Sequence, residues 1–166
     1  GGLHGVGMSV VNALSKEMSA EVRRGGKIYR QTYAYGKITS EVTVIGECPI
    51  EETGTIIHFK PDETIFKEGT VYDFKIIAQR LSELSFLNKG IKLILIDKRG
   101  EGKTETFYHP NGISEFIPFL NRNKKPLHKD VIIFEKEKDD VIVDVAMQFT
   151  DSYTENIYSY TNNIHT

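Results

Sequence analysis

The chain has 166 residues, and its 21 Lys and Arg against 23 Asp and Glu leave a formal net charge of −2. A chain of this length can bury roughly 68–70% of its unfolded surface, so we expect a substantial core in one domain or two small ones. No apolar run approaches the roughly 18 residues of a membrane span. The near-neutral charge excludes a strongly basic nucleic-acid module, and the single cysteine, Cys48, excludes an intrachain disulfide. These features favour a cytoplasmic protein, and a first residue Gly1 without initiator Met or signal peptide indicates a piece of a longer chain.

The first part of the chain predicts one helix followed by strands. A glycine-rich opening precedes apolar residues at helical spacing, namely Val6, Val10, Val11, Leu14 and Met18. Between about residues 20 and 35 the pattern is that of two strands, which Gly25-Gly26 joins as a hairpin turn. Two further strands are predicted at Glu41 to Ile45 and Thr55 to Phe59, and Pro61 stops the second.

The middle of the chain predicts a long helix and a strand pair. Apolar residues form one stripe over Val71 to Asn88, on which Leu81 faces the core while Glu83 lies off the stripe. Ile91 to Asp97 predicts a buried strand, and Lys103 to His109 predicts its neighbour after a glycine-containing turn.

The pattern changes at Pro110-Asn111-Gly112, which we interpret as a domain boundary at about residues 109 to 112. Beyond it the sequence predicts a short helix interrupted by Pro118 and strands near residues 131–135 and 141–149. The mixed charges from Arg122 to Asp140 indicate a solvated loop more readily than a nucleic-acid contact.

The glycine-rich opening is the one stretch whose chemistry points to a ligand. Glycines ahead of a helix let backbone N–H groups approach an anion closely, and the positive end of the helix favours negative charge there. A phosphate cradle and a plain flexible loop both remain open. The string is no P-loop, because no Gly-Lys-Ser/Thr follows, and no dinucleotide fingerprint, because the third glycine is missing.

Other candidate sites are weaker. Thr53-Gly54-Thr55 could present a hydroxyl group to a ligand, or it could be turn chemistry alone. The five histidines show no ligand spacing, so we expect no metal site made by this chain alone. The residues by themselves therefore indicate an α+β protein with a possible anion-binding loop.

Read as a whole, the string from Gly1 to Ser15 resembles the ATP lid and following helix of the ATPase subunits of bacterial type IIA DNA topoisomerases, those of DNA gyrase and of topoisomerase IV. Three later strings match in the same order, so that the resemblance covers essentially the whole chain: Thr53 to Thr55, Arg80 to Asn88 and Glu155 to Ile164. Histidine kinases, mismatch-repair proteins of the MutL type and heat-shock chaperones share a glycine-rich lid but not these strings. Asp97-Lys98-Arg99 favours gyrase over topoisomerase IV.

The resemblance implies the fold and the residues of a binding site. Residues 1–109 would be the later part of a Bergerat-type (GHKL) ATP-binding α/β sandwich including the ATP lid, and residues 110–166 the start of an α/β transducer domain. Thr55 and Ile57 would line the adenine pocket, and Arg24 would contact coumarin-type inhibitors at its mouth, although it fits an exposed hairpin arginine equally well. The lid residues that would contact the ATP phosphates are Gly2, Leu3, His4, Gly5, Val6 and Gly7.

The resemblance also implies that the catalytic residues lie outside this chain. The Asn that holds magnesium, the Glu that activates water and the Asp that reads adenine would precede Gly1, and the Gln and Lys that reach the γ-phosphate would follow Thr166. ATP and Mg²⁺ are the expected cofactors, with the magnesium ligand outside this chain. We therefore expect no catalytic or metal-binding residue here, and no ATPase activity from the isolated fragment.

The expected function is that of a fragment of the ATP-binding subunit of a type II DNA topoisomerase, which uses ATP binding and hydrolysis to drive strand passage and change DNA supercoiling. The expected partners are double-stranded DNA through the full-length enzyme, the DNA-cleaving subunit of the gyrase A type, and a second copy of the ATPase region, with no membrane involved. The alternative is a non-enzymatic β-rich binding or interaction module with a flexible Gly-rich loop.

Overall fold

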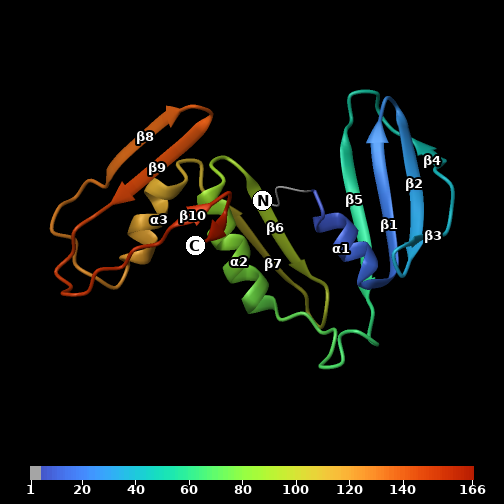
Figure 1. Ribbon diagram of the computed structural model, residues 1–166, viewed down its shortest axis with the longest axis horizontal. Helices are drawn as coiled ribbons and strands as arrows, with labels where there is room; N and C mark the ends of the chain where they lie inside the picture. The colour runs from blue at the N-terminus through green and yellow to red at the C-terminus, as the bar shows by residue number, and fades with distance from the viewer. Residues whose placement is uncertain (1–4) are drawn as a thin grey trace. The chain divides into compact units, whose positions relative to one another are not determined.

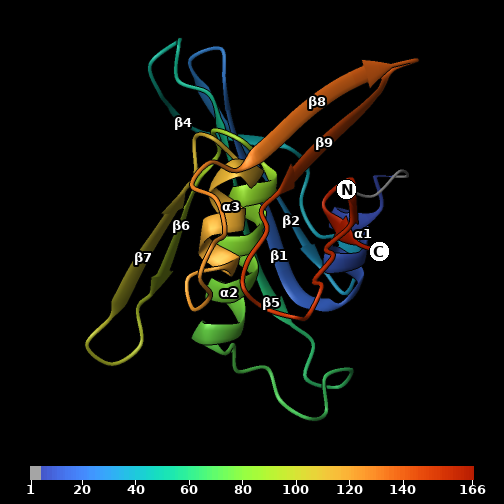
Figure 2. The same cartoon turned by 90° about the vertical axis from the view of Figure 1, so that its left-hand side faces the viewer.

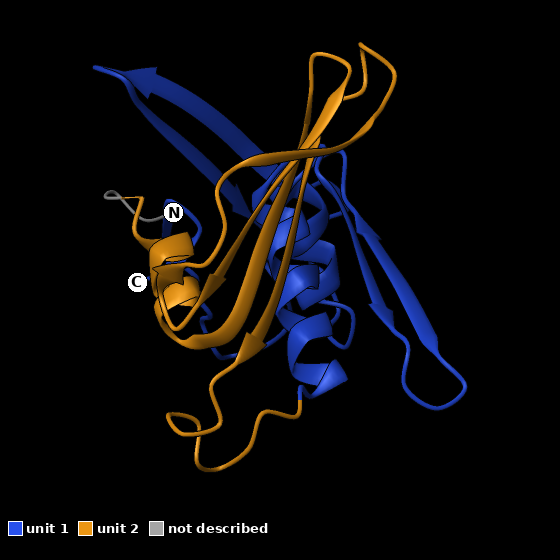
Figure 3. Ribbon diagram, turned by 90° about the vertical axis from the view of Figure 1, so that its right-hand side faces the viewer, with its two compact units in different colours: residues 1, 72–166 blue, residues 2–71 orange. Residues whose placement is uncertain are grey.

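The computed structural model describes residues 5–166, in which three helices stand among groups of antiparallel strands, and this confirms the α+β class (Figure 1). The chain divides into two compact units, residues 2–71 and residues 72–166, with the break after Val71 (Figure 3). The domain boundary predicted at residues 109–112 lies inside the second unit and stays a prediction. Between residues 5 and 166, no helix combines the length and the apolar character that a bilayer span requires.

One helix and one antiparallel sheet make up the described part of residues 2–71. The sheet has the strand order β3-β2-β1-β5, and β4 also pairs with β2. The elements are α1 (Gly7–Ala13), β1 (Ser15–Arg24), β2 (Lys27–Ala34), β3 (Lys37–Ile38), β4 (Thr43–Glu47) and β5 (Gly54–Pro61). The predicted hairpin is confirmed: Gly25 and Gly26 have φ values of 59° and 79°, which a two-residue turn between such strands requires.

The prediction that the first helix reaches Met18 is wrong, because α1 ends at Ala13 and Met18 is buried in β1. Ser15 makes the change from helix to strand. Its hydroxyl donates to the carbonyl of Val11 at 2.6 Å, while its own carbonyl accepts from the backbone N–H of Tyr35 at 3.0 Å. A spacing of four residues suits both a helix face and a strand face, so the periodicity alone could not separate the two.

Residues 72–166 contain two helices and six strands. The elements are α2 (Phe74–Leu87), β6 (Lys92–Asp97), β7 (Lys103–Tyr108), α3 (Ile113–Leu120), β8 (Ile132–Lys138), β9 (Val141–Met147), β10 (Tyr160–Thr161) and β11 (Ile164–His165). The strands form three antiparallel pairs, β6 with β7, β8 with β9, and β10 with β11. Figure 2 shows α3 beside α2, and α2 also packs against β6 and β7.

The long helix begins later than predicted because Asp73 caps it. The Asp73 carboxylate accepts from the backbone N–H groups of Lys75 and Ile76 at 2.7 and 3.1 Å, which fixes the first turn at Phe74. At its other end, Asn88 donates its side-chain amide to the carbonyl of Leu84 at 2.7 Å. The helix thus has a polar cap at both ends.

An aromatic cluster forms the core of residues 72–166. Phe86 on α2 is 2% exposed and stacks on His109 with ring centroids 3.5 Å apart. On its other sides lie Phe116 and Phe119 of α3, at 4.9 and 5.2 Å between ring centroids. The predicted interruption of the short helix at Pro118 is wrong, because α3 continues through Pro118 to Leu120. Proline removes only one backbone hydrogen bond there, and the buried Phe116 anchors the helix in this cluster.

Several predictions about burial are wrong. Leu81 is only half-buried, and Glu83 is as well. The strand expected to be buried, β6, instead alternates between exposed and half-buried residues, with Ile94 and Ile96 54% and 58% exposed. Within residues 5–166 it pairs with β7 alone, and α2 covers one of its faces. The substantial core expected from length is also wrong: in the described part only three apolar side chains are buried, Met18, Phe86 and Phe116.

Candidate functional site

The predicted lid is described from Gly5 onward, and Gly2, Leu3 and His4 lie outside the described residues. Gly5 has a φ of 63°, which favours glycine, and Val6 already has helical dihedral angles. The first backbone bond of α1 runs from the N–H of Val10 to the carbonyl of Val6, 2.9 Å. The N–H groups of the residues in between are therefore not used inside the helix.

The two described lid glycines differ in what they require. A Cβ atom added to Gly5 or Gly7 would meet no atom of the described residues within 4 Å, so packing against this part of the chain demands glycine at neither position. Gly5 needs glycine for its positive φ, whereas Gly7 has an ordinary helical conformation. A side chain at Gly7 would therefore change only the open space in front of the backbone, where a ligand could approach the N–H groups.

The sheet register brings three of the predicted residues to one face. Thr55 lies opposite Val22, and Ile57 lies opposite Ala20 on the neighbouring strand. Arg24 follows Val22 by two residues on β1 and so points to the same face, diagonally across from Thr55. Residues separated by more than thirty positions in sequence thereby share one surface of the sheet.

The two faces of this sheet differ in character. The face with Thr55 and Ile57 also carries Met18 and Phe59, so it is mainly apolar. The opposite face carries ion pairs, with Arg23 Nε 3.0 Å from a Glu52 carboxylate oxygen and Arg30 Nε 3.7 Å from one of Glu21. The apolar face suits a flat, poorly solvated ring, whereas the charged face suits water.

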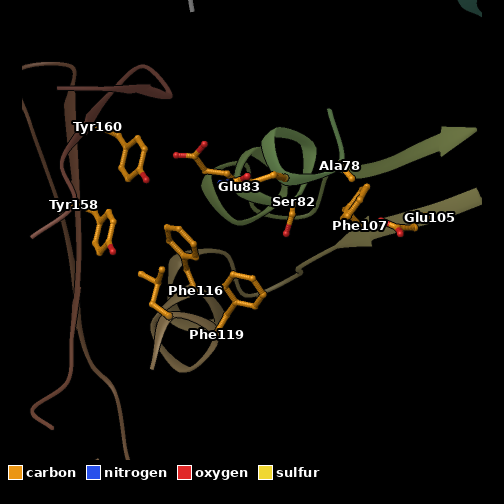
Figure 4. A pocket seen from close by; sticks show the side chains of 11 residues that line it. Ala78, Ser82, Glu83, Glu105, Phe107, Phe116, Phe119, Tyr158 and Tyr160 are labelled. Carbon is orange, nitrogen blue, oxygen red and sulfur yellow. The ribbon is translucent and has the colours of Figure 1, made fainter. Parts of the chain in front are cut away.

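A second site, which sequence reasoning missed, is a groove of about 510 Å³ within residues 72–166 (Figure 4). It contains none of the predicted site residues. The residues that line it come from α2, β7, α3 and the segment ending in β10: Ala78, Gln79, Ser82, Glu83, Glu105, Phe107, Phe116, Phe119, Leu120, Tyr158 and Tyr160. The signal for it was present in the sequence, since the strings from Arg80 to Asn88 and from Glu155 to Ile164 both contribute to this wall.

Two polar side chains at the groove, Tyr160 and Glu83, shift each other's pKa. Burial and a hydrogen bond to Glu83 raise the pKa of Tyr160 to about 12. Burial by itself would raise the pKa of Glu83, but hydrogen bonds from Tyr160 and Arg80 outweigh it, so that this pKa is lowered. Glu83 is therefore an anion held by two donors. Among residues 5–166, no group of three or more His, Cys, Asp or Glu side chains could hold a metal ion.

A polar cluster around Glu115 fixes the turn between β7 and α3. Glu115 accepts from the backbone N–H and the side-chain amide of Asn111 at 3.0 and 2.8 Å, and its other oxygen lies 2.9 Å from Nδ1 of His109. The hydrogen bond to His109, followed by that from the Asn111 backbone, lowers the pKa of Glu115. One carboxylate at the start of α3 thus holds both sides of the turn at the predicted boundary.

Comparison with known proteins gives a consistent family. A family model described as DNA gyrase B matches residues 112–166. The DNA gyrase B protein of Bacillus mycoides is 48% identical over 166 residues, which is 100% of this chain and 41% of that protein. The DNA gyrase B protein of Archaeoglobus fulgidus is 52% identical over 170 residues, covering 100% of this chain and 26% of that protein.

Solved structures agree. The 43K ATPase domain of Thermus thermophilus gyrase B, determined in complex with an aminocoumarin, superposes with a TM-score of 0.89 at 36% identity, covering 98% of this chain and 44% of that one. The expected Bergerat-type (GHKL) fold is thereby confirmed. The chain spans about a quarter to two fifths of the curated relatives named above. Similarity over its whole length shows that the chain belongs to the DNA gyrase B family of type IIA DNA topoisomerases.

Proposed function

We propose that this chain is the part of an ATP-binding type II topoisomerase subunit that carries the ATP lid, one wall of the adenine pocket and the beginning of the transducer. In the complete protein, ATP binding and hydrolysis would drive the passage of one DNA duplex through another and so change supercoiling. The observation that carries the proposal is the register of β1 and β5, which gathers Thr55, Ile57 and Arg24 on one apolar face. The interaction-module alternative explains neither this arrangement nor the family membership.

The proposed roles follow from the chemistry of each group. Backbone N–H groups of Gly5, Val6 and Gly7, together with Gly2, Leu3 and His4, donate hydrogen bonds to phosphate oxygens as the lid closes. Ile57 supplies an apolar contact to the adenine ring, and the Thr55 hydroxyl holds a water molecule that bridges to its polar edge. Arg24, exposed at the end of β1, is positioned for an inhibitor or a ligand edge at the pocket mouth.

The residues of this chain fit ATP better than they fit magnesium. The glycines leave open space at the backbone, as a phosphate ligand needs. The described residues, in contrast, form no acidic or histidine cluster that could hold a cation. As the family resemblance implies, we assign the magnesium ligand and the residues that activate water to other parts of the complete protein, and this chain acts by binding and orienting the nucleotide.

The proposal extends to domains and partners. Residues 1–109 belong to the ATP-binding domain and residues 110–166 to the transducer; support comes from the family match, which begins at residue 112. The complete protein works in the cytoplasm with a second copy of itself, with the DNA-cleaving subunit and with double-stranded DNA. The near-neutral net charge of −2 suits a part that binds nucleotide rather than the DNA duplex.

A matched pair of substitutions tests the adenine wall. Ile57 and Ile56 are neighbours on β5 with similar exposures of 36% and 44%, but they lie on opposite faces of the sheet. Ile57→Gln places an unsatisfied amide against the adenine ring, so we expect the ATP dissociation constant of the complete protein to rise roughly tenfold or more. Ile56→Gln should leave it unchanged. Titration calorimetry measures both, and equal losses of affinity would contradict the proposed pocket.

A further inference from the structure

Two segments far apart in sequence are joined by hydrogen bonds within residues 72–166. Arg80 Nη2 donates to the backbone carbonyl of Asn163 at 3.1 Å, and the Asn163 side-chain amide donates to Asn88 Oδ1 at 2.9 Å. The Tyr160 side chain interacts with the Glu83 carboxylate and helps to lower its pKa, and Figure 4 shows the Tyr160 ring on the side of the groove that faces Glu83. We call these five residues the clasp; it ties the second half of α2 to the β10–β11 hairpin.

Arg80 is the centre of the clasp because it bonds to both segments. Its Nη1 donates to Glu83, one turn further along α2, while its Nη2 reaches the hairpin. A guanidinium group can direct two N–H bonds in fixed directions, whereas a lysine ammonium cannot reproduce that fork. The same Glu83 also interacts with Tyr160, so the helix and the hairpin share one polar network.

The hairpin turn presents Asn163 to the helix. Asn162 and Asn163 have φ values of 49° and 67°, the left-handed conformation that a two-residue hairpin turn requires and that asparagine tolerates. Asn88 meets it at the end of α2, using its amide nitrogen for the carbonyl of Leu84 and its oxygen for Asn163. The hairpin is thus attached to the cap of the helix.

Packing near the clasp is open. The groove of about 510 Å³ lies between α3 and the segment of Tyr158 and Tyr160, and a ring contact across it joins Phe116 to Tyr158, at 6.4 Å between ring centroids. Apolar packing of the hairpin is therefore sparse there. Hydrogen bonds between partly exposed groups contribute modestly to stability and can break and reform. The clasp therefore has the properties of a connection that can be released, unlike a buried apolar core.

We propose that the clasp couples the ATP-binding domain to the transducer, with Arg80 as its main positioning residue. This inference rests on the proposed function and on the proposed division at residues 109–110, which places α2 in one domain and the β10–β11 hairpin in the other. α2 follows β5, the strand that bears Thr55 and Ile57, through the connection of residues 62–73. Movement of α2 during the nucleotide cycle is then passed to the hairpin through hydrogen bonds that Arg80 directs.

The test uses the complete protein assembled with its DNA-cleaving partner, and compares Arg80→Lys and Tyr160→Phe with the unmodified enzyme. Arg80→Lys retains the charge beside Glu83 but loses the fork, and Tyr160→Phe removes one hydroxyl group. We expect ATP hydrolysis within about twofold of the unmodified rate and the number of supercoils introduced per ATP to fall about five- to tenfold, as for a lost coupling. Gln79→Ala, which changes the groove wall but not the clasp, is the control and should keep the ratio.

The outcomes separate this inference from the proposed function. An unmodified enzyme that neither binds ATP nor supercoils DNA contradicts the proposed function itself. If the unmodified enzyme is active, two outcomes overturn the clasp alone. In one, supercoiling and ATP hydrolysis fall in proportion; in the other, the number of supercoils per ATP is unchanged in both clasp variants. Thermal melts identify a variant that fails to fold; Tyr160→Phe, the smaller change, then decides by its ratio.

Discussion

Gly7 offers the sharpest test of the phosphate cradle, because nothing among residues 5–166 requires a glycine at this position. A Cβ atom there meets nothing within 4 Å, and the residue opens α1 in an ordinary helical conformation. Replacing it by Val should slightly favour the helix, since glycine is the poorer helix former by a few tenths of a kcal/mol. We therefore expect the melting temperature of the complete protein to stay within about 2 °C.

Nucleotide binding should respond very differently to Gly7→Val. A branched side chain in front of the lid backbone keeps phosphate oxygens away from its N–H groups, and each hydrogen bond to a charged group contributes about 1.5–3 kcal/mol. Losing one such bond corresponds to roughly a 10- to 150-fold rise in the ATP dissociation constant. Gly5→Val is a poorer probe, because the φ of 63° adds about 1–2 kcal/mol of backbone strain to any effect on binding.

The assay combines nucleotide titration and thermal melts on the same preparation of the complete protein. Gly46→Ala is the matched control, since Gly46 lies within β4 and a new Cβ atom would make only an ordinary contact with Ile28 at 3.6 Å. The control should change neither quantity. Unchanged ATP affinity in Gly7→Val would refute the cradle, and a large loss of stability would show that the glycine serves the fold.

Three further predictions concern stability and activity. Phe86→Ala should lower the free energy of unfolding by about 3–5 kcal/mol, because the ring fills the core between His109 and α3; urea denaturation measures it, with the exposed Phe119→Ala as the milder comparison. The lowered pKa of Glu115 stabilises the fold above the carboxyl's ordinary pKa of about 4.3, and this stabilisation is lost as pH falls through the folded value, so urea midpoints should drop more steeply below pH 5 in the unmodified protein than in Glu115→Gln. The isolated 166-residue chain should release no phosphate from ATP with magnesium, and turnover comparable to that of the complete ATPase region would contradict the assignment of the catalytic groups elsewhere.

Local sequence patterns predicted the elements better than their burial. The Gly25-Gly26 turn and the long helix were predictable because turn chemistry and a 3.6-residue stripe act over short distances. Met18 was assigned wrongly because a period of four fits helix and strand alike. The exposure of Ile94 and Ile96 was missed because burial depends on which elements cover a strand, and no local pattern contains that information.

The candidate site shows the same division between local and long-range information. A strand prediction for Thr55 to Phe59 already implies that Thr55 and Ile57 share a face, since side chains alternate. That Arg24 joins them depends on the register of β1 against β5, which pairs Val22 with Thr55 and would invert the faces if shifted by one residue. The clasp depends on a pairing across 83 positions, between Arg80 and Asn163, which only the folded chain displays.

Hydrogen bonds hold both ends of the connection between β5 and α2. The carbonyl of Leu14, at the end of α1, accepts from the backbone N–H of Asp62 at 2.9 Å, immediately after β5. The buried Asp62 carboxylate in turn accepts from the backbone N–H and the hydroxyl of Thr64 at 2.9 and 2.8 Å, which fixes the start of the connection to α2. Asp73 caps α2 at the other end of that connection, and Arg80 follows two turns later. Each end of this connection is thus held by hydrogen bonds at the terminus of an element, where backbone angles can change without opening a core, so the connection has a defined start and end but few packing constraints of its own.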